Sequence, residues 1–200
     1  MKIAILGGAF DPPHLGHAIV AQELLQHLEI DEVWLMPVYS HPLNKALLPA
    51  VDRLAMTKLL ETEQIKVSDF EIKKADTSYT IETLQSLEKR YPEHEFSWCI
   101  GSDMLADFHK WKDWETLIAQ YPFVIYPRGF SSQDLTLKVE AAFKLSPLPA
   151  RIQVLNDADI TITNISSTRI KTKLKKHESI AHLIPVEVQS YIKTNHLYER

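Results

Sequence analysis

The sequence predicts an α/β fold with a doubly wound, mostly parallel sheet, and three observations lead to this prediction. Short apolar runs alternate with amphipathic segments along most of the chain. The chain opens in the order strand, loop, helix, strand, within the length of one βαβ unit. Glycine is scarce, at 5 of 200 residues, and three of the five lie within the first sixteen residues. Glycine this scarce marks positions where no other residue fits.

The elements of the first half follow from periodicity and from the residues that end each run. Residues 2–6 form a short apolar run that ends at two glycines, which is typical of a buried strand. Apolar residues at helical spacing predict a helix over 15–28, and a proline closes a second apolar strand over 32–36. After a proline-punctuated loop, one-sided apolar spacing predicts a helix over 52–61, and weak alternation predicts one or two short strands within 65–72.

The second half continues the alternation of helices and strands. An amphipathic segment predicts a helix over 81–91, and the apolar run 96–100, which ends at a glycine, predicts a strand. The remaining elements are expected in this order: a helix over 114–120, a strand over 123–126, a helix over 133–143, a strand over 152–155, and helices over 167–176 and 186–195. Ligands in such a sheet bind beyond the carboxyl ends of the strands, so the residues that follow each strand are the candidates for chemistry.

Composition limits the class of protein. A chain of 200 residues with 45% hydrophobic and 24% charged residues is expected to form one globular domain over 1–200. The net charge of −4 argues against a nucleic-acid-binding protein, and no stretch approaches the ~18 apolar residues of a membrane span. Nothing resembles a signal peptide, and the lone Cys99 excludes an intrachain disulfide and a cysteine-based zinc site. We therefore expect a cytoplasmic protein that binds neither nucleic acid nor membrane and has no metal-ligand cluster.

The segment GGAFDPPHLGH, residues 7–17, follows the first expected strand directly. Its glycine pair lets the backbone approach a ligand closely and exposes N–H donors. His14 and His17 lie three residues apart on one face of a helix start, where free amides and the helix dipole attract anions. Gly16 leaves room for a phosphate or a base against the backbone. The segment predicts a polyphosphate cradle without a P-loop lysine, and the plainer alternative is that the histidines only cap a helix.

Three weaker signals lie further along the chain. Hydroxyl side chains at 166–168 precede a lysine-rich helix, which indicates either a second anion site or an ordinary capped helix with a solvated basic face. Asp103 comes just after a glycine at a strand end, a place suited to binding a ribose hydroxyl. Trp111 and Trp114 are, by themselves, more typical of packing than of a ligand platform.

Together these segments resemble the H-x-G-H nucleotidyltransferase superfamily. GGAFDPPHLGH is similar to the G-G-x-F-D-P-x-H-x-G-H signature of bacterial nicotinate-nucleotide adenylyltransferases. Residues 78–84 resemble the family's S-Y-T-x-x-T-L, residues 100–103 with two later tryptophans resemble its I-G-x-D…W…W/Y, and residues 165–171 resemble its I-S-S/A-T-x-I-R. The segment 191–198 fits its C-terminal Y-I…L-Y. The resemblance runs nearly end to end and implies a Rossmann-like nucleotidyltransferase fold.

The resemblance assigns roles by position. The residues it makes catalytic, because they would hold the ATP phosphates and the transition state, are His14, His17 and Lys45. The residues it places around ATP are Gly8, Ala9, Phe10, Gly101, Asp103, Ser167, Thr168, Ile170 and Lys171. The residues it places around the mononucleotide are Tyr79, Thr80 and Trp111, with the indole of Trp111 stacked on the pyridine ring.

Two positions depart from the family pattern. Where the family has P-P-H-K, this chain has Pro-Leu-Asn-Lys over 42–45, with His41 as a substitute for the missing histidine. Lys171 stands where the family has arginine, so the charge is kept and the two-pronged guanidinium is lost.

The activity that the resemblance implies is adenylyl transfer, in which ATP and nicotinate mononucleotide give deamido-NAD and pyrophosphate. The attacking group is a phosphate that is already an anion, so no protein nucleophile is required. Mg²⁺ would arrive on the ATP phosphates, since no carboxylate cage is evident. The alternatives are a related enzyme that uses nicotinamide mononucleotide, phosphopantetheine or a polyol phosphate, and a nucleotide-binding sensor without turnover. The sequence leaves a homo-oligomer open.

Overall fold

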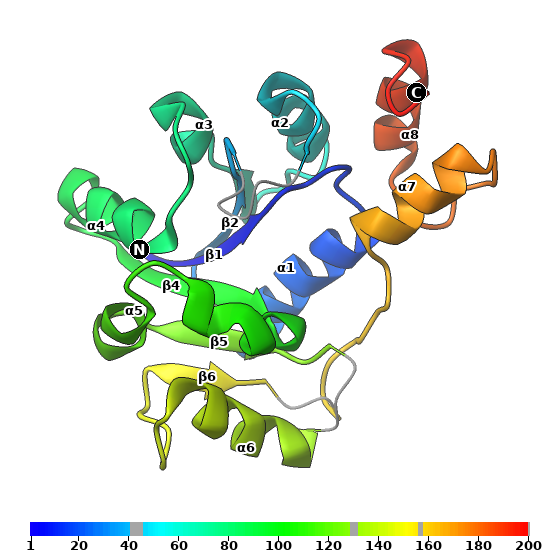
Figure 1. Ribbon diagram of the computed structural model, residues 1–200. Helices are drawn as coiled ribbons and strands as arrows, with labels where there is room; N and C mark the ends of the chain where they lie inside the picture. Colours follow the sequence, from blue (N-terminus) through cyan, green and yellow to red (C-terminus); the bar gives the residue numbers. More distant parts are fainter. Residues whose placement is uncertain (41–45, 129–131, 156–157, 200) are drawn as a thin grey trace.

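The computed structural model describes residues 1–40, 46–128, 132–155 and 158–199 (Figure 1). Six strands form one sheet in the order β3-β2-β1-β4-β5-β6. The strands are β1 (Lys2–Gly8), β2 (Glu32–Pro37), β3 (Ile65–Val67), β4 (Glu95–Gly101), β5 (Phe123–Tyr126) and β6 (Ile152–Val154). Every pairing between these strands is parallel, which confirms the expected sheet. The strand order reverses between β1 and β4, and such a switch point is where ligands bind in this architecture.

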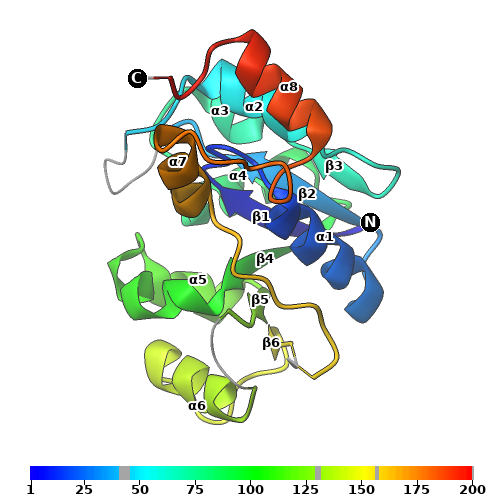
Figure 2. The ribbon, with the colours of Figure 1, turned by 90° about the vertical axis from the view of Figure 1, so that its right-hand side faces the viewer.

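Helices connect the strands and cover both faces of the sheet. They are α1 (Leu15–His27), α2 (Ala50–Lys58), α3 (Phe70–Lys74), α4 (Thr80–Arg90), the 3-10 helix η1 (Ser102–Lys110), α5 (Trp114–Gln120), α6 (Ser132–Phe143), α7 (Ser167–Lys175) and α8 (Val186–Thr194). In Figures 1 and 2, α1, α7 and α8 lie on one side of the sheet, and α4 and α5 lie on the other.

Alternation along the central strand builds two hydrophobic cores. Ile3 and Ile5 of β1 point to the face packed by α4, η1, α5 and α6. Ala4 and Leu6, from the same strand, point to the face packed by α1, α2, α7 and α8. These four side chains are between 0% and 9% exposed, because a central parallel strand is covered on both sides. The buried sheet fixes the position of the loops at its edges.

The structure corrects the expected strands within 65–72. Only Ile65–Val67 is a strand, and the helix α3 begins at Phe70. Glu71 of α3 is 2% exposed, and its carboxylate accepts a 2.7 Å hydrogen bond from the Thr83 hydroxyl of α4. The buried contact of Glu71 is with another helix, α4. The weak alternation within 65–72 does not record a contact of this kind, so it was misleading. The 3-10 helix η1 was also not expected from the sequence.

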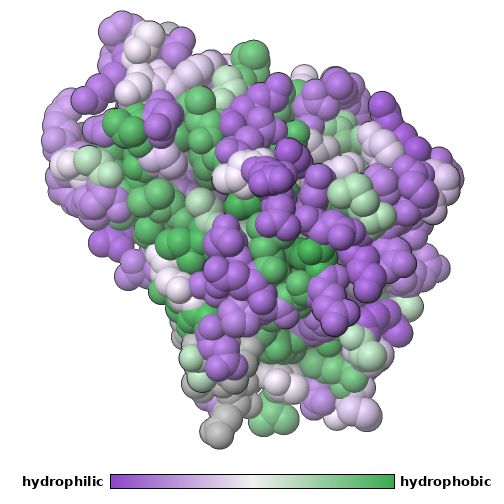
Figure 3. Space-filling model, turned by 180° about the vertical axis from the view of Figure 1, so that it is seen from behind, coloured by the Kyte–Doolittle hydropathy of each residue, from purple (hydrophilic) through white to green (hydrophobic). Residues whose placement is uncertain are grey.

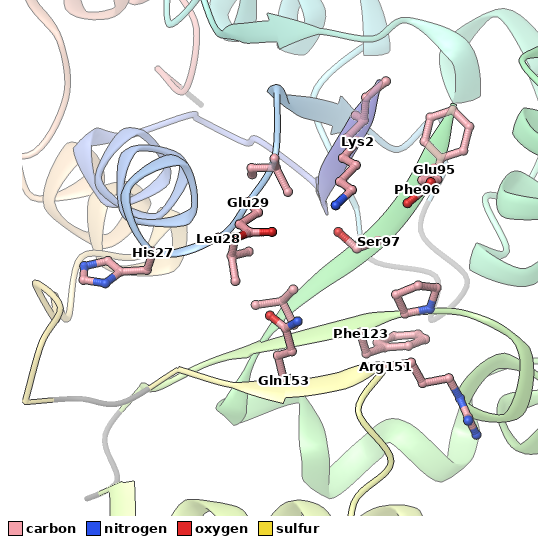
Figure 4. Close-up of a pocket in the computed structure, with 14 residues that line it drawn as sticks. Lys2, His27, Leu28, Glu29, Glu95, Phe96, Ser97, Phe123, Arg151 and Gln153 are labelled. Carbon is pink, nitrogen blue, oxygen red and sulfur yellow. The ribbon is translucent and has the colours of Figure 1, made fainter. Parts of the chain in front are cut away.

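The opposite edge of the sheet, at the amino ends of the strands, also has a pocket of about 430 Å³. Figure 4 shows Lys2, Glu29 and Gln153 around this space and Arg151 directed away from it. Its lining mixes both charges and lies on the side of the sheet where parallel folds of this kind do not bind ligands. The face seen in Figure 3 carries hydrophilic side chains with apolar ones interspersed through its middle. None of the described helices is both long and apolar enough to cross a bilayer.

Candidate active site

A small cavity of about 50 Å³ lies at the carboxyl ends of β1, β4 and β5, beside the start of α1. Three residues expected from the sequence line it: His14, His17 and Gly101. The other lining residues are Leu6, Gly16, Val20, Cys99, Tyr126, Arg128 and Thr163. The switch point of the sheet therefore coincides with the histidine motif.

The two histidines form one stacked unit at the start of α1. Their rings have centroids 3.7 Å apart and planes inclined by 20°. The backbone N–H of His14 donates to Nδ1 of His17 at 3.2 Å, and the backbone N–H of His17 donates to the carbonyl oxygen of His14 at 2.9 Å. Because Nδ1 of His17 accepts a hydrogen bond, the neutral ring carries its proton on Nε2. His17 therefore does cap the helix start, as the plainer alternative proposed. Its Nε2–H is left to donate to a ligand.

Both histidines are neutral at physiological pH in the unliganded protein. Burial first, and then the nearby positive charge of Arg128, lower the pKa of His14 from 6.5 to about 4. The pKa of His17 is also well below its ordinary value, because of burial first and then because of His14 and Arg128. His14 is 4% exposed, and its Nδ1 has no hydrogen-bond partner among the described residues. These rings are therefore suited to donate hydrogen bonds to anionic oxygens without a resident positive charge.

Gly16 has a different role from the expected one. A Cβ placed there would lie 2.9 Å from Nδ1 of His14 and 3.4 Å from Cβ of Ile165. The space beside the Gly16 backbone is thus filled by the His14 ring and by the chain before α7, and a ligand does not have to occupy it. Glycine is required for the close packing of the histidine pair.

Phe10 and Gly8 shape the loop that leads to the histidines. Phe10 has a φ of 48°, a left-handed conformation that is uncommon for an aromatic residue, and is 1% exposed. Its ring packs against His17 with 4.5 Å between centroids and lies 3.4 Å from a Cβ built on Gly8. The side chain of Phe10 is therefore part of the core, and only its backbone and those of Gly8 and Ala9 can serve the expected contacts to a nucleotide.

Arg128 is a cation of this site that sequence reasoning missed. It follows β5, and its guanidinium lies 3.5 Å from the carboxylate of Asp103 and donates to the carbonyl oxygen of Ile165 at 3.0 Å. Its backbone N–H donates to the Ser102 hydroxyl at 2.7 Å, which ties the ends of β4 and β5 together. A Cβ on Gly101 would force the Asp103 and Arg128 side chains to move, so these side chains pack closely on the strand end. The position of Arg128 just past a strand was the signal that could have identified it.

The start of α7 reaches the same loop. Ser166 is the N-cap, and its hydroxyl accepts a 3.2 Å hydrogen bond from the backbone N–H of Arg169. The Ser167 hydroxyl donates to the carbonyl oxygen of Pro12 at 2.9 Å, whereas Thr168 is exposed. Ile170 is 0% exposed in the core, so its side chain does not face a ligand. The helix start is therefore held beside the first loop, with Thr168 as its free hydroxyl side chain.

Lys171 makes a contact that the sequence did not suggest. Its ammonium binds the carboxylate of Asp11 at 2.9 Å, and Asp11 is 2% exposed. In the unliganded structure Lys171 therefore serves the loop before α1. Its expected contact with ATP stays a prediction.

Arg53 of α2 is a second residue that sequence reasoning missed. It is 1% exposed, and its guanidinium donates to four carbonyl oxygens at 2.7–2.9 Å. These acceptors belong to Ala9, Val38, Tyr39 and Leu48. One buried cation thus connects the loops that follow β1 and β2. A buried arginine within an amphipathic helix gives no sequence signal that separates it from an exposed one.

The residues expected at the mononucleotide lie on the other side of the switch point. Tyr79 is the N-cap of α4 and makes no side-chain capping bond, and Thr80 is the first residue of the helix. Lys112 lies 4.9 Å from the centroid of the Tyr79 ring and binds Glu82 at 2.7 Å. Trp111, the residue before Lys112, is half-buried and packs on Phe108 with 4.9 Å between ring centroids. The structure thus brings the Trp111 segment and the start of α4 together.

Comparisons with known proteins agree with this arrangement. Residues 5–173 match the family described as cytidylyltransferase-like. A probable nicotinate-nucleotide adenylyltransferase of Shewanella pealeana is 38% identical, over 99% of this chain and 96% of its own length. One of Bacillus licheniformis is 36% identical, over 99% and 98%. The chain belongs to the nicotinate-nucleotide adenylyltransferase family.

A solved structure supports the fold of this adenylyltransferase. Plasmodium falciparum nicotinic acid mononucleotide adenylyltransferase, complexed with NaAD, superposes with a TM-score of 0.82 at 22% sequence identity. The alignment covers 99% of this chain and 97% of that one. The expected Rossmann-like nucleotidyltransferase fold is thereby confirmed.

Two expectations for the adenylyltransferase site need a separate statement. Lys45, which the resemblance makes catalytic, lies outside the described residues, as does His41. Within the described ranges, no group of three or more His, Cys, Asp or Glu side chains could hold a metal ion. The described polar side chains that line the histidine cavity include the two neutral histidines, the hydroxyl groups of Tyr126 and Thr163, and Arg128.

Proposed function

We propose that this adenylyltransferase transfers the adenylyl group of ATP to the 5′-phosphate of nicotinate mononucleotide, giving deamido-NAD and pyrophosphate. The observation that carries the proposal is the stacked, neutral pair of His14 and His17 at the start of α1, in a cavity at the switch point of the sheet. An anion that approaches this helix start meets a favourable helix dipole and the Nε2–H of His17, whereas the backbone N–H groups of His14, Leu15 and His17 are bonded within the protein. A triphosphate is the ligand that these donors suit.

The chemistry places little demand on the protein. The attacking oxygen belongs to a phosphate that is ionised at neutral pH, so neither a general base nor a protein nucleophile is needed. The only cysteine, Cys99, is 1% exposed, and burial raises the pKa of its thiol to about 12. It therefore stays protonated and does not form a covalent intermediate. The role of the site is to align the mononucleotide phosphate in line with the α-phosphorus and the departing pyrophosphate.

Charge on the departing pyrophosphate is stabilised from several directions. His17 donates a hydrogen bond, the start of α7 presents amides, and Arg128 supplies a guanidinium that lines the same cavity. Lys45 is expected to add an ammonium group from the loop after β2. Mg²⁺ would be carried by the ATP substrate and would supply positive charge at its phosphates, in keeping with the way this ion is usually bound.

The nicotinate end is recognised at the start of α4. Tyr79 caps this helix without a side-chain bond, so the first amides of α4 are open to an anionic group such as the nicotinate carboxylate. Trp111 offers a flat surface for the pyridine ring from the neighbouring segment. A carboxylate accepts hydrogen bonds from such amides at both of its oxygens, whereas a carboxamide also requires an acceptor. This difference favours the acid over the amide substrate.

Further features of the chain belong to the same proposal. The whole chain acts as one domain, because the hydroxyl of Tyr198 reaches Asp11 near the other end of the sequence. We expect a cytoplasmic enzyme with small-molecule substrates and no nucleic-acid partner. Measurement of the mass in solution tests for a homo-oligomer.

An acceptor panel tests the proposed function. ATP with Mg²⁺ is combined in turn with nicotinate mononucleotide, nicotinamide mononucleotide, phosphopantetheine and a polyol phosphate, and released pyrophosphate is measured. We expect the highest kcat/KM for nicotinate mononucleotide. A higher value for another acceptor would assign the enzyme to a related reaction, and absence of pyrophosphate with every acceptor would indicate a nucleotide sensor.

A further inference from the structure

The loop before α1 is held by side chains from distant parts of the chain. Arg53 of α2 binds the carbonyl oxygen of Ala9 at 2.9 Å. Ser167 of α7 binds the carbonyl oxygen of Pro12 at 2.9 Å. Asp11, between these two positions, accepts hydrogen bonds through its side-chain carboxylate. Ala9, Asp11 and Pro12 are therefore each hydrogen-bonded to a side chain from a distant segment. All three lie just before His14 in the sequence.

Asp11 receives two hydrogen bonds on its two carboxylate oxygens. Lys171 donates to Oδ2 at 2.9 Å, and the Tyr198 hydroxyl donates to Oδ1 at 2.7 Å. Asp11 is 2% exposed, so its charge would be costly to bury without these partners. Tyr198 lies after α8, 187 residues along the chain from Asp11. The Tyr198 hydroxyl thus attaches the C-terminal segment to the histidine loop.

The two partners of Asp11 differ in how firmly they are held. The side chain of Lys171 is 33% exposed and lies on a flexible aliphatic stem, and it is also an expected ATP ligand. Tyr198 is half-buried and its ring packs with the core on the α1 side of the sheet. Arg53 contributes as well, since its charge lies close enough to both Asp11 and Tyr198 to affect their electrostatics. Tyr198 is therefore the more rigid of the two donors to Asp11.

We propose that Tyr198 is a positioning residue, whose hydroxyl fixes the Asp11 carboxylate and thereby the loop that presents His14 and His17 to the reacting phosphates. The inference rests on the proposed adenylyl transfer for its kinetic consequence only. Asp11 is joined to Phe10 and Pro12, and the Phe10 ring packs directly on His17, so a shift at Asp11 reaches the histidine pair. Small displacements of this kind reduce the rate of a reaction that depends on in-line alignment. Tyr198 itself touches no substrate in this account.

The test uses Tyr198→Phe, which keeps the packed ring and removes only the hydroxyl. We expect kcat to fall by about 5- to 50-fold, a range set by the sensitivity of such reactions to misplacement of about 1 Å. The KM values for ATP and nicotinate mononucleotide should stay within about threefold, because the binding groups remain. Tyr121→Phe is the matched control, since the Tyr121 hydroxyl donates to a carboxylate, Glu88, at 2.9 Å, and neither residue lines the histidine cavity. A fall in kcat of the same size in both variants would overturn the proposal.

A double-mutant cycle separates positioning from general stability. In an Asp11→Ala background, Tyr198→Phe should cause no further fall in kcat, because the partner through which it acts is absent. Tyr121→Phe should have the same small effect in both backgrounds. An additive loss for Tyr198→Phe and Asp11→Ala would overturn the proposal.

A measurement without substrates tests the position of the histidines directly. Its result does not depend on which acceptor the enzyme uses. The imidazole nitrogen and carbon-bound hydrogen signals of His14 and His17 are recorded by NMR for the parent and the two tyrosine variants. We expect these signals to move in Tyr198→Phe and to stay in place in Tyr121→Phe. Unchanged signals in Tyr198→Phe would overturn the proposal. A parent enzyme that turns over no acceptor would instead contradict the proposed function, and the NMR result would still decide the role of Tyr198.

Discussion

The Ser167 hydroxyl donates a 2.9 Å hydrogen bond to the carbonyl oxygen of Pro12, across 155 residues of sequence. This bond joins the start of α7 to the loop that precedes α1. Two helix N-termini, each the positive end of a helix dipole, therefore lie beside one loop. A triphosphate bound there can be contacted by both ends at once. The relationship supports the proposal that two motifs far apart in the sequence form one phosphate-binding region.

Replacing His17 by alanine is expected to lower kcat by roughly 10²–10³, the range for loss of one preorganised donor to developing charge. The neutral Nε2–H that His17 presents to a phosphate would be lost. Steady-state kinetics measure the change, and His182→Ala, at an exposed position outside the site, is the control. Turnover near the parent value in His17→Ala would remove this residue from the mechanism.

Arg53→Met is expected to lower the free energy of unfolding by about 3–5 kcal/mol, because four carbonyl oxygens lose the donor that a buried guanidinium supplies. Methionine keeps much of the aliphatic volume, so the effect reports the hydrogen bonds more than the packing. Urea denaturation followed by circular dichroism measures the loss. The exposed Arg90→Met should change stability by no more than about 0.5 kcal/mol. Equal stabilities for the two variants would contradict the role given to Arg53.

Trp111→Ala should raise KM for nicotinate mononucleotide and leave KM for ATP nearly unchanged. Stacking of an aromatic side chain on a base contributes about 1–3 kcal/mol, which corresponds to roughly 5- to 150-fold in affinity. Trp114→Ala is the matched control, since Trp114 also packs near Phe108, with 6.4 Å between ring centroids. Both variants should lose some stability. A KM effect of the same size on both substrates, or in both variants, would favour a purely structural role for Trp111.

The low pKa of His14 predicts a pH dependence of stability. Above about pH 6.5 the ring is neutral in both the folded and the unfolded chain, so its contribution is constant. As the pH falls from 6.5 towards 4, the unfolded chain takes up a proton that the folded chain does not, and the free energy of unfolding decreases. The loss attributable to His14 is on the order of 3 kcal/mol when the pH reaches 4.

His14→Gln isolates this contribution, because glutamine does not titrate. Denaturation of the parent and the variant is compared at several pH values from 7 to 4. The parent should lose stability more steeply than the variant as the pH falls. Parallel curves across this interval would show that His14 titrates normally in the folded protein.

The sequence was informative where function depends on local chemistry. The glycine pair and the spacing of His14 and His17 predicted a strand, a loop and a helix start in the right places, because these features depend on neighbouring residues. The capping serine at 166 likewise acts within its own helix. Such signals survive in a single sequence because each is contained within about one turn of chain.

The parts that the sequence could not predict depend on contacts between distant segments. Arg53, Arg128 and Tyr198 look like ordinary surface or helix residues until the fold places carbonyl oxygens or carboxylates beside them. For Gly16 only part of the packing is local, since a Cβ there would meet the ring of His14, two residues away, and Ile165, which precedes α7. Long-range packing decides these roles, and one-dimensional patterns do not record it.

The central claim is that the mononucleotide phosphate attacks the α-phosphorus of ATP directly, without a covalent protein intermediate. The most direct measurement is the stereochemistry at that phosphorus, with one diastereomer of α-thio-ATP and nicotinate mononucleotide as substrates. The configuration of the thio-dinucleotide product is determined by ³¹P NMR against standards. A single in-line displacement predicts inversion of configuration. Retention would require two displacements through an adenylylated protein group, and it would contradict the account.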